Sequence, residues 1–194
     1  MAAVTDEIYE KYLQKAIVET NELGEEIARA AGDGQVPVLG SGHPLADIFL
    51  LKHGPKPAEV QEGVAFFGRA GQALLKSFQR LNVDAVAVYG TNCLKFADGD
   101  EEQARPWLAR ELHIVQPKLV VVMGESALAF LNSLEFPLSD PIEPKLGELQ
   151  RFTATIQALY VPDIDESLDE APAKNRFWKA FKAVGPWWAE LPPY

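Results

Sequence analysis

The sequence predicts an α/β fold in which a parallel sheet is covered by helices on both faces. Short apolar runs alternate along the chain with longer segments whose apolar residues recur every three or four positions. This alternation of strand and helix is typical of parallel sheets. The run at 119–123 is continuously apolar, as expected of a central parallel strand. With 194 residues, 47% of them hydrophobic, the chain can form one domain with a full core.

The first half of the chain predicts two helices and two strands. An amphipathic helix is expected at about residues 5–31, ending at the glycines that follow Ala31. A short buried strand follows at 36–39. Apolar side chains at helical spacing predict a helix over 70–81, and the run Ala-Val-Ala-Val-Tyr predicts a second strand at 85–89.

The second half continues the alternation. A helix is expected at 101–116, where Pro106 is compatible only near the first turn. The strand at 119–123 is followed by a helix at 127–134 and a proline-rich acidic loop. A fourth strand at 155–161 and a helix at 175–184 complete the pattern, and Trp187 and Trp188 are expected to pack against the body. We therefore expect a single domain over residues 1–194.

Composition and charge exclude several classes of protein. No apolar run approaches the roughly 20 residues of a membrane span, and acidic residues near the start replace a basic, apolar leader, so we expect a cytoplasmic protein that contacts no membrane. The single cysteine, Cys93, allows neither an internal disulfide nor a cysteine-ligated cluster.

The net charge of −10 predicts weak, salt-sensitive non-specific binding to DNA. However, residues 34–118 carry nine basic and nine acidic side chains, so a local basic strip is possible. Its candidate members are Lys52, Lys56, Arg69, Lys76, Lys95 and Arg105.

Two polar turns follow the first two predicted strands, at residues 40–47 and 91–95. If both strands are parallel, both turns lie at the carboxyl edge of the sheet, where α/β folds bind ligands. Asn92 offers an amide donor and acceptor side by side, which matches the edge of a nucleobase. Asp47 could orient water, or it could cap a helical turn. Phe66 and Phe67 could stack on a planar ligand, or belong to the core.

Three other patterns are weaker evidence for a functional site. The glycines around Ser41 could cradle a phosphate, but the third glycine of a dinucleotide fingerprint is missing. The turn around Ser126 half resembles a nucleophile elbow, yet every histidine precedes that serine, so Ser126 is interpreted as a helix-start residue. His43 and His53 match no standard metal site, and we expect no metal.

Taken in order, these motifs resemble the uracil-DNA glycosylase superfamily, most closely its family 4-like bacterial members. The resemblance is carried by FFGRAG at 66–71, TNCLK at 91–95, RPWL at 105–108 and PKLVVVMGESA at 117–127. It implies a three-layer α/β/α sandwich with a central four-stranded parallel sheet, and a pocket for a uracil flipped out of DNA.

The resemblance also implies roles for individual residues. Phe66 would stack on the base and Asn92 would read its Watson–Crick edge. Ser41 and Gly42 would contact the base, while Asp47 and His43 would be catalytic. The implied DNA contacts are Arg69, Lys95 and Pro162.

The chain departs from the family at three motifs. Family 4 members hold an iron–sulfur cluster through four cysteines, but Phe96 and Ala104 stand at two of those positions, so no cluster and no other cofactor is expected. The family's His-Pro-Ser motif is replaced by residues 161–163, Val-Pro-Asp. The family's Gly-Glu-x-Pro-Gly turn reads Gly-Ser-Gly-His-Pro-Leu at 40–45, with one extra residue, so His43 could substitute for the lost function or merely fill space.

The leading hypothesis is a monomeric enzyme that hydrolyses the N-glycosidic bond of uracil, or of a related deaminated base, in DNA. The alternative is a catalytically degenerate member that binds DNA or a protein partner without base excision. Val161 in place of histidine, and the acidic composition, favour the alternative.

Overall fold

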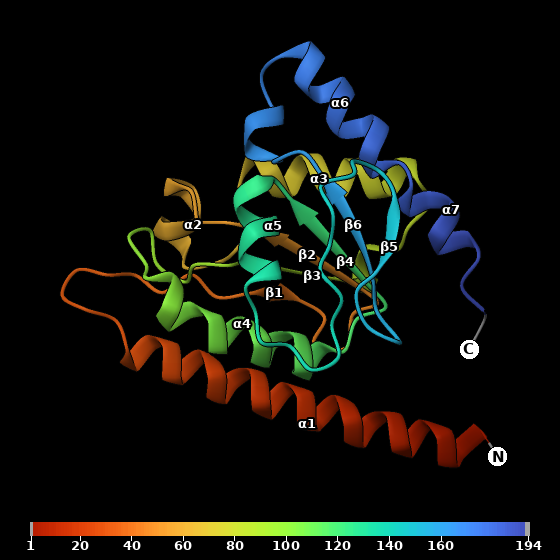
Figure 1. Ribbon diagram of the computed structural model, residues 1–194. Helices are drawn as coiled ribbons and strands as arrows, with labels where there is room; N and C mark the ends of the chain where they lie inside the picture. Colours follow the sequence, from red (N-terminus) through yellow and green to blue (C-terminus); the bar gives the residue numbers. More distant parts are fainter. Residues whose placement is uncertain (1, 193–194) are drawn as a thin grey trace.

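A computed structural model describes residues 2–192, and it contains a sheet covered by helices on both faces (Figure 1). The strand order is β1-β3-β2-β4-β6-β5. The four inner strands run parallel, and β1 and β5 pair antiparallel at the two edges. The predicted α/β/α sandwich with four central parallel strands is thus confirmed, with an edge strand added on each side. The strands are β1 (Ser41–Gly42), β2 (Ile48–Lys52), β3 (Val88–Asn92), β4 (Leu119–Met123), β5 (Leu149–Arg151) and β6 (Gln157–Val161).

Two hydrophobic cores lie on opposite faces of this sheet, because successive strand side chains point to opposite sides. Val120 and Val122 of β4 face one core, and Leu119, Val121 and Met123 face the other. Helices α1, α4 and α5 cover the first face, and α3, α6 and α7 cover the second. The helices are α1 (Ala2–Arg29), α2 (Pro57–Glu62), α3 (Arg69–Arg80), α4 (Glu101–Val115), α5 (Glu125–Asn132), α6 (Ala171–Phe181) and α7 (Val184–Ala189), and short 3-10 turns span Ala85–Ala87 and Asp165–Ser167.

The prediction of the first strand is wrong, and the error matters for the site. Residues 36–39 form no strand; Leu39 makes only an isolated bridge with Val64. The strand is β2, five buried residues between β3 and β4. Pro37 lacks a donor for a ladder, whereas the run Ile-Phe-Leu-Leu-Lys supplies a donor at every residue. The turn at 40–47 therefore precedes β2 instead of following a strand.

Other boundaries shift by a few residues. The strand expected at 85–89 begins at Val88, because the Asp84 carboxylate accepts from the Val86 amide at 3.0 Å and closes a 3-10 turn first. Asn92 is thereby the last residue of β3. Helix α4 ends one residue before the expected position, at the left-handed Gln116, and Pro106 is accommodated inside it. The first helix occupies Ala2–Arg29 and so ends two residues before the expected position.

The amino-terminal half of α1 extends past the body of the protein (Figure 1). Ala16, Leu23 and Ile27 are buried, whereas Ile8 and Tyr12 on the same helix are exposed. The packing of α1 against α4 is therefore confined to the second half of the helix.

Candidate functional site

A buried network of charged side chains lies at the carboxyl edge of the sheet, where β2 and β3 end. Lys52, the last residue of β2, is 1% exposed. Its ammonium donates to the Glu59 carboxylate at 2.6 Å, to the Asp165 carboxylate at 2.9 Å and to the Gly54 carbonyl at 3.1 Å. All three of its hydrogens are used. Removing one partner from such a pair leaves an uncompensated buried charge.

Glu59 of α2 is the centre of this network. One carboxylate oxygen accepts from the Lys52 ammonium and from the Lys56 amide at 2.7 Å. The other accepts from the Phe66 amide at 2.6 Å and from the Asn92 side-chain amide at 3.2 Å. Glu59 was not predicted from the sequence, where its only signal is the Lys-Pro-Ala-Glu start of a helix, a pattern that also occurs for structural reasons alone.

Phe66 has a strained backbone conformation and packs its ring against the sheet. Its φ of 62° is a left-handed conformation that costs a non-glycine residue about 1–3 kcal/mol. The hydrogen bond from its amide to Glu59 stabilises that conformation, and the lack of a side chain at Gly71 leaves room for its carbonyl oxygen. The ring packs on Gly90, where an added Cβ would come within 2.6 Å of it. The Lys52 ammonium lies over the ring, 5.5 Å from its centroid.

Asn92 is fully buried beside Phe66 and Glu59. Its amide nitrogen donates to Glu59, but its Oδ1 is buried with no hydrogen-bond partner among the described residues. Leaving such an acceptor unpaired costs about 1–3 kcal/mol. The side chain can therefore accept a hydrogen bond from an N–H group that reaches it.

The structure contradicts the expected DNA contact at Lys95. This lysine is 1% exposed, and its ammonium donates to the Thr91 hydroxyl and the Asn92 carbonyl, both at 2.7 Å, and to the Glu111 carboxylate. Tyr89 also donates to that carboxylate at 2.8 Å. Burial, followed by the Glu111 charge, raises the pKa of Tyr89 well above its ordinary value. Lys95 therefore neutralises a buried carboxylate and stabilises the turn after β3.

The second half of the turn at 40–47, with His43 and Asp47, lies at the amino edge, opposite to Asn92, so the expected meeting of these residues with Asn92 is wrong. The Asp47 carboxylate pairs with Lys118 at 3.0 Å, and its carbonyl accepts from the amides at the start of β4. The His43 ring accepts from the Leu45 amide at 3.1 Å. Ser41 and Gly42 form β1, and the Ser41 hydroxyl donates to the Ala65 carbonyl at 2.9 Å. Asp47 and His43 form no part of the carboxyl-edge site, whereas Ser41 and Gly42 line a pocket together with Phe66 and Gly90.

The remaining predicted residues lie near that edge. Arg69 is exposed at the start of α3 and pairs with Asp169 at 2.6 Å. Pro162 is half-buried after β6, and the Asp163 carboxylate accepts from the Asp165 amide at 2.7 Å. Asp163 therefore shapes the turn that brings Asp165 to Lys52.

Comparison with known proteins agrees with this architecture. A profile described as the uracil DNA glycosylase superfamily matches residues 39–182. The chain belongs to the uracil-DNA glycosylase superfamily. The type-4 uracil-DNA glycosylase of Archaeoglobus fulgidus is 24% identical over 159 residues, which cover 76% of this chain and 80% of that protein. The enzymes of the same name from Sulfurisphaera tokodaii and Thermotoga maritima are each 30% identical, over 105 and 101 residues, and this chain spans about half of each (48% and 53%).

The place implied for a family 4 iron–sulfur cluster does not fit such a group in this superfamily member. Cys93, the single cysteine of the sequence, is fully buried, and burial raises the pKa of its thiol. Phe96 and Ala104 are buried in the same apolar core, and the Phe96 ring meets Trp107 edge-on at 6.3 Å. Apolar packing thus occupies the space, and we assign no role to a cluster.

Within residues 2–192, no group of three or more histidine, cysteine or acidic side chains is arranged to hold a metal ion. No helix among the described residues is long and apolar enough to cross a membrane.

Proposed function

We propose that this superfamily member binds DNA without excising uracil, because its own side chains fill the base site. The observation that carries the proposal is the Lys52 side chain over the Phe66 ring, with its ammonium 5.5 Å from the centroid. Stacked aromatic rings have centroids about 4.5–7 Å apart, so the ammonium occupies the shell that a stacked base requires. Gly90 packs against the ring as well.

The charges at the edge also oppose excision. Cleavage of the N-glycosidic bond leaves an anionic base, which needs positioned donors. Glu59 and Asp165 instead place two carboxylates beside Lys52 and consume its hydrogens. The Asn92 amide donor is directed to Glu59. At the end of β6, where the family has histidine, Val161 is fully buried in the core and offers no side-chain donor.

An excision assay tests the proposal directly. The purified chain, in stoichiometric amount, is incubated with labelled single- and double-stranded oligonucleotides that contain one uracil, followed by alkali cleavage. We expect no cleaved product, while fluorescence anisotropy detects binding to the same strands. Formation of product by the wild-type chain would overturn the proposal.

A variant that opens the site tests the reason for inactivity. Lys52→Gly combined with Glu59→Gln removes the covering side chain and the charge of its partner, while the substituted amide keeps an acceptor for the Phe66 backbone N–H. We expect this double variant to bind a uracil-containing strand more tightly than a matched thymine strand, a preference absent from the wild type. Lys118→Gly, at the amino edge, is the matched control.

One observation favours a second candidate, an active glycosylase. The unpaired Asn92 Oδ1 is a buried acceptor, which matches the ring N–H of uracil. In that case Lys52 would leave the ring face and its ammonium would stabilise the departing base. Product in the wild-type assay, reduced about 10²–10³-fold by Lys52→Met and also lost in Asn92→Ala, would support this candidate.

A further inference from the structure

A stripe of basic side chains runs along one face of α3. Arg69, Lys76 and Arg80 are exposed and fall seven and four positions apart, which is helical spacing. Ala70, Leu74 and Phe78, on the opposite face, are buried in the core. With a rise of about 1.5 Å per residue, the stripe extends over roughly 16 Å. The helix therefore presents a row of cations to its outer side.

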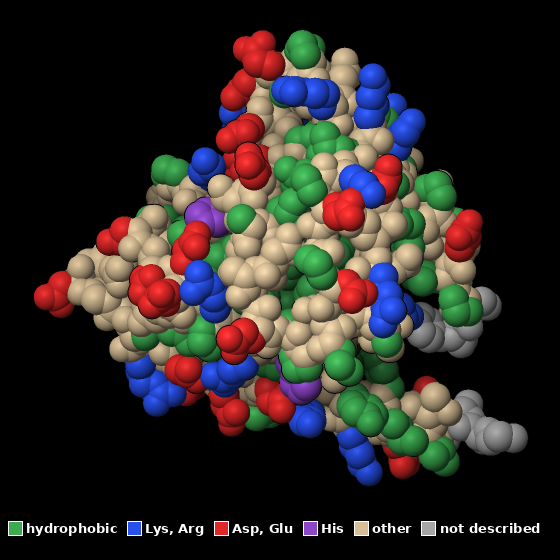
Figure 2. All heavy atoms as spheres, viewed as in Figure 1, with side chains coloured by type: hydrophobic (Ala, Val, Ile, Leu, Met, Phe, Trp, Pro, Cys, Tyr) green, Lys and Arg blue, Asp and Glu red, His purple; other side chains and the backbone are tan. Residues whose placement is uncertain are grey.

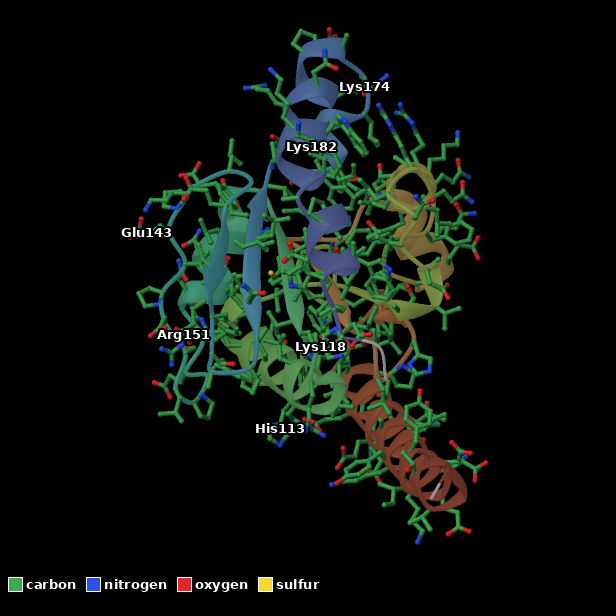
Figure 3. All side chains as sticks on the ribbon, turned by 90° about the vertical axis from the view of Figure 1, so that its right-hand side faces the viewer. His113, Lys118, Glu143, Arg151, Lys174 and Lys182 are labelled. Atoms are coloured by element: carbon green, nitrogen blue, oxygen red, sulfur yellow. The ribbon has the colours of Figure 1, made fainter. Side chains whose placement is uncertain are left out.

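Helix α6 forms the other wall of a groove beside this stripe. Lys174 and Trp178 line it from α6, and the Arg80 guanidinium lies over the Trp178 ring, 4.1 Å from its centroid. The groove has a volume of about 510 Å³. Figure 3 labels Lys174 near the outer end of α6, with α3 in yellow beside it. Figure 2 shows basic side chains gathered over α6.

The charge of the groove is opposite to that of the chain. Four cations line it, and none of the described lining residues carries a carboxylate, although the net charge is −10. Asp169 pairs with Arg69 at the rim, where the Arg69 guanidinium lowers the pKa of that carboxyl group. Clustering of this kind in an acidic protein favours a polyanionic ligand.

The groove begins beside the candidate base site. Ser167 and Ile164, around the 3-10 turn after β6, line it, and Asp165 of the same turn bonds to Lys52. A DNA strand that runs past the Lys52-covered Phe66 ring would therefore reach the groove at this 3-10 turn.

We propose that the groove between α3 and α6 binds the sugar–phosphate backbone of one DNA strand. The identity of the ligand as DNA rests on the proposed function; the location rests on the four cations. Arg69, Lys76, Arg80 and Lys174 contact phosphates, and the flat pair formed by Arg80 and Trp178 provides a surface on which a base stacks.

The test uses a fluorescein-labelled oligothymidylate without uracil, so that excision plays no part. Its affinity for the full chain is measured by anisotropy over a series of KCl concentrations. Lys76→Gln/Lys174→Gln removes two cations, neither of which makes a described structural ion pair. Lys11→Gln/Lys15→Gln, on the projecting half of α1, is the control with the same charge change.

We expect the groove variant to bind about tenfold more weakly at low salt. The slope of log K against log[KCl] should fall by about 1.4, since each single-strand phosphate contact contributes about 0.7. The control should keep both the affinity and the slope of the wild type. Equal effects of the two variants, or no effect of either, would overturn the groove assignment even if wild-type binding and the absence of excision both hold.

Discussion

The Lys52→Met substitution measures how completely the proposed base site is closed. Methionine keeps most of the volume of lysine but removes the ammonium, so Glu59, 2% exposed, keeps a negative charge without its cation. Breaking a buried pair in this way costs about 3–5 kcal/mol. The total stability of a domain is about 5–15 kcal/mol, so the loss would be large.

The loss of free energy can be checked by urea unfolding, and the loss of Tm by thermal unfolding, both followed through the fluorescence of the four tryptophans. For a chain of this length, about 1 kcal/mol corresponds to about 2–4 °C in Tm, so a decrease of roughly 6–20 °C is expected. Lys52→Met/Glu59→Gln should recover at least half of the loss, because the stranded charge is removed and the acceptor for the Phe66 amide remains.

Lys118→Met provides the comparison for a more exposed ion pair. Its ammonium bonds Asp47 at 3.0 Å, but the two side chains are 36% and 21% exposed, so a change of about 0–1 kcal/mol is expected. If Lys52→Met cost no more than this control, Glu59 would be solvated, and the argument that Lys52 and Glu59 close the base site would fail.

Three further outcomes are expected. Burial raises the pKa values of Cys93 and Tyr89, so at high pH only the unfolded chain releases their protons. The free energy of unfolding should therefore fall with rising pH, above about 8.5 through Cys93 and above about 10 through Tyr89. Tyr89→Phe should make this decline, measured by guanidinium unfolding, less steep. The Cys93 thiol should react with a maleimide only in denaturant, and rapid labelling of the native chain would contradict its burial. Gly90→Ala should destabilise the chain by about 1–3 kcal/mol in urea unfolding, because the added methyl group collides with the Phe66 ring. Gly34→Ala is the comparison: its φ is 75° and its added Cβ would meet nothing within 4 Å, so it measures the cost of backbone strain without a collision.

Local sequence patterns were sufficient to predict most of the helices and strands of the fold. Strand β4 was predicted with its exact bounds, because a short, continuously apolar run is typical of a central parallel strand that is buried on both faces. Helices α3 and α4 were predicted within a residue or two, since their apolar residues recur at helical spacing. The motifs around Phe66 and Asn92 were enough to indicate the superfamily.

The candidate site was only half determined by the sequence. Asn92 and Phe66 were singled out because an amide after a strand and an aromatic ring between glycines are local signals. Asp47 and His43 were placed at the wrong edge, because one missed strand, β2, reverses the side of the sheet on which a neighbouring turn lies. The order of strands in space cannot be read from local periodicity.

The contacts on which the proposed closing of the base site rests were decided by the tertiary structure alone. The sequence determined that a carboxyl-edge amide and a phenylalanine are present, and that cluster cysteines and the motif histidine are not. Only the fold brings Lys52, Glu59 and Asp165 together, from segments up to 113 positions apart. Because these charged side chains are buried, they must pair with one another. That pairing places the Lys52 ammonium over the Phe66 ring, on which a base is proposed to stack.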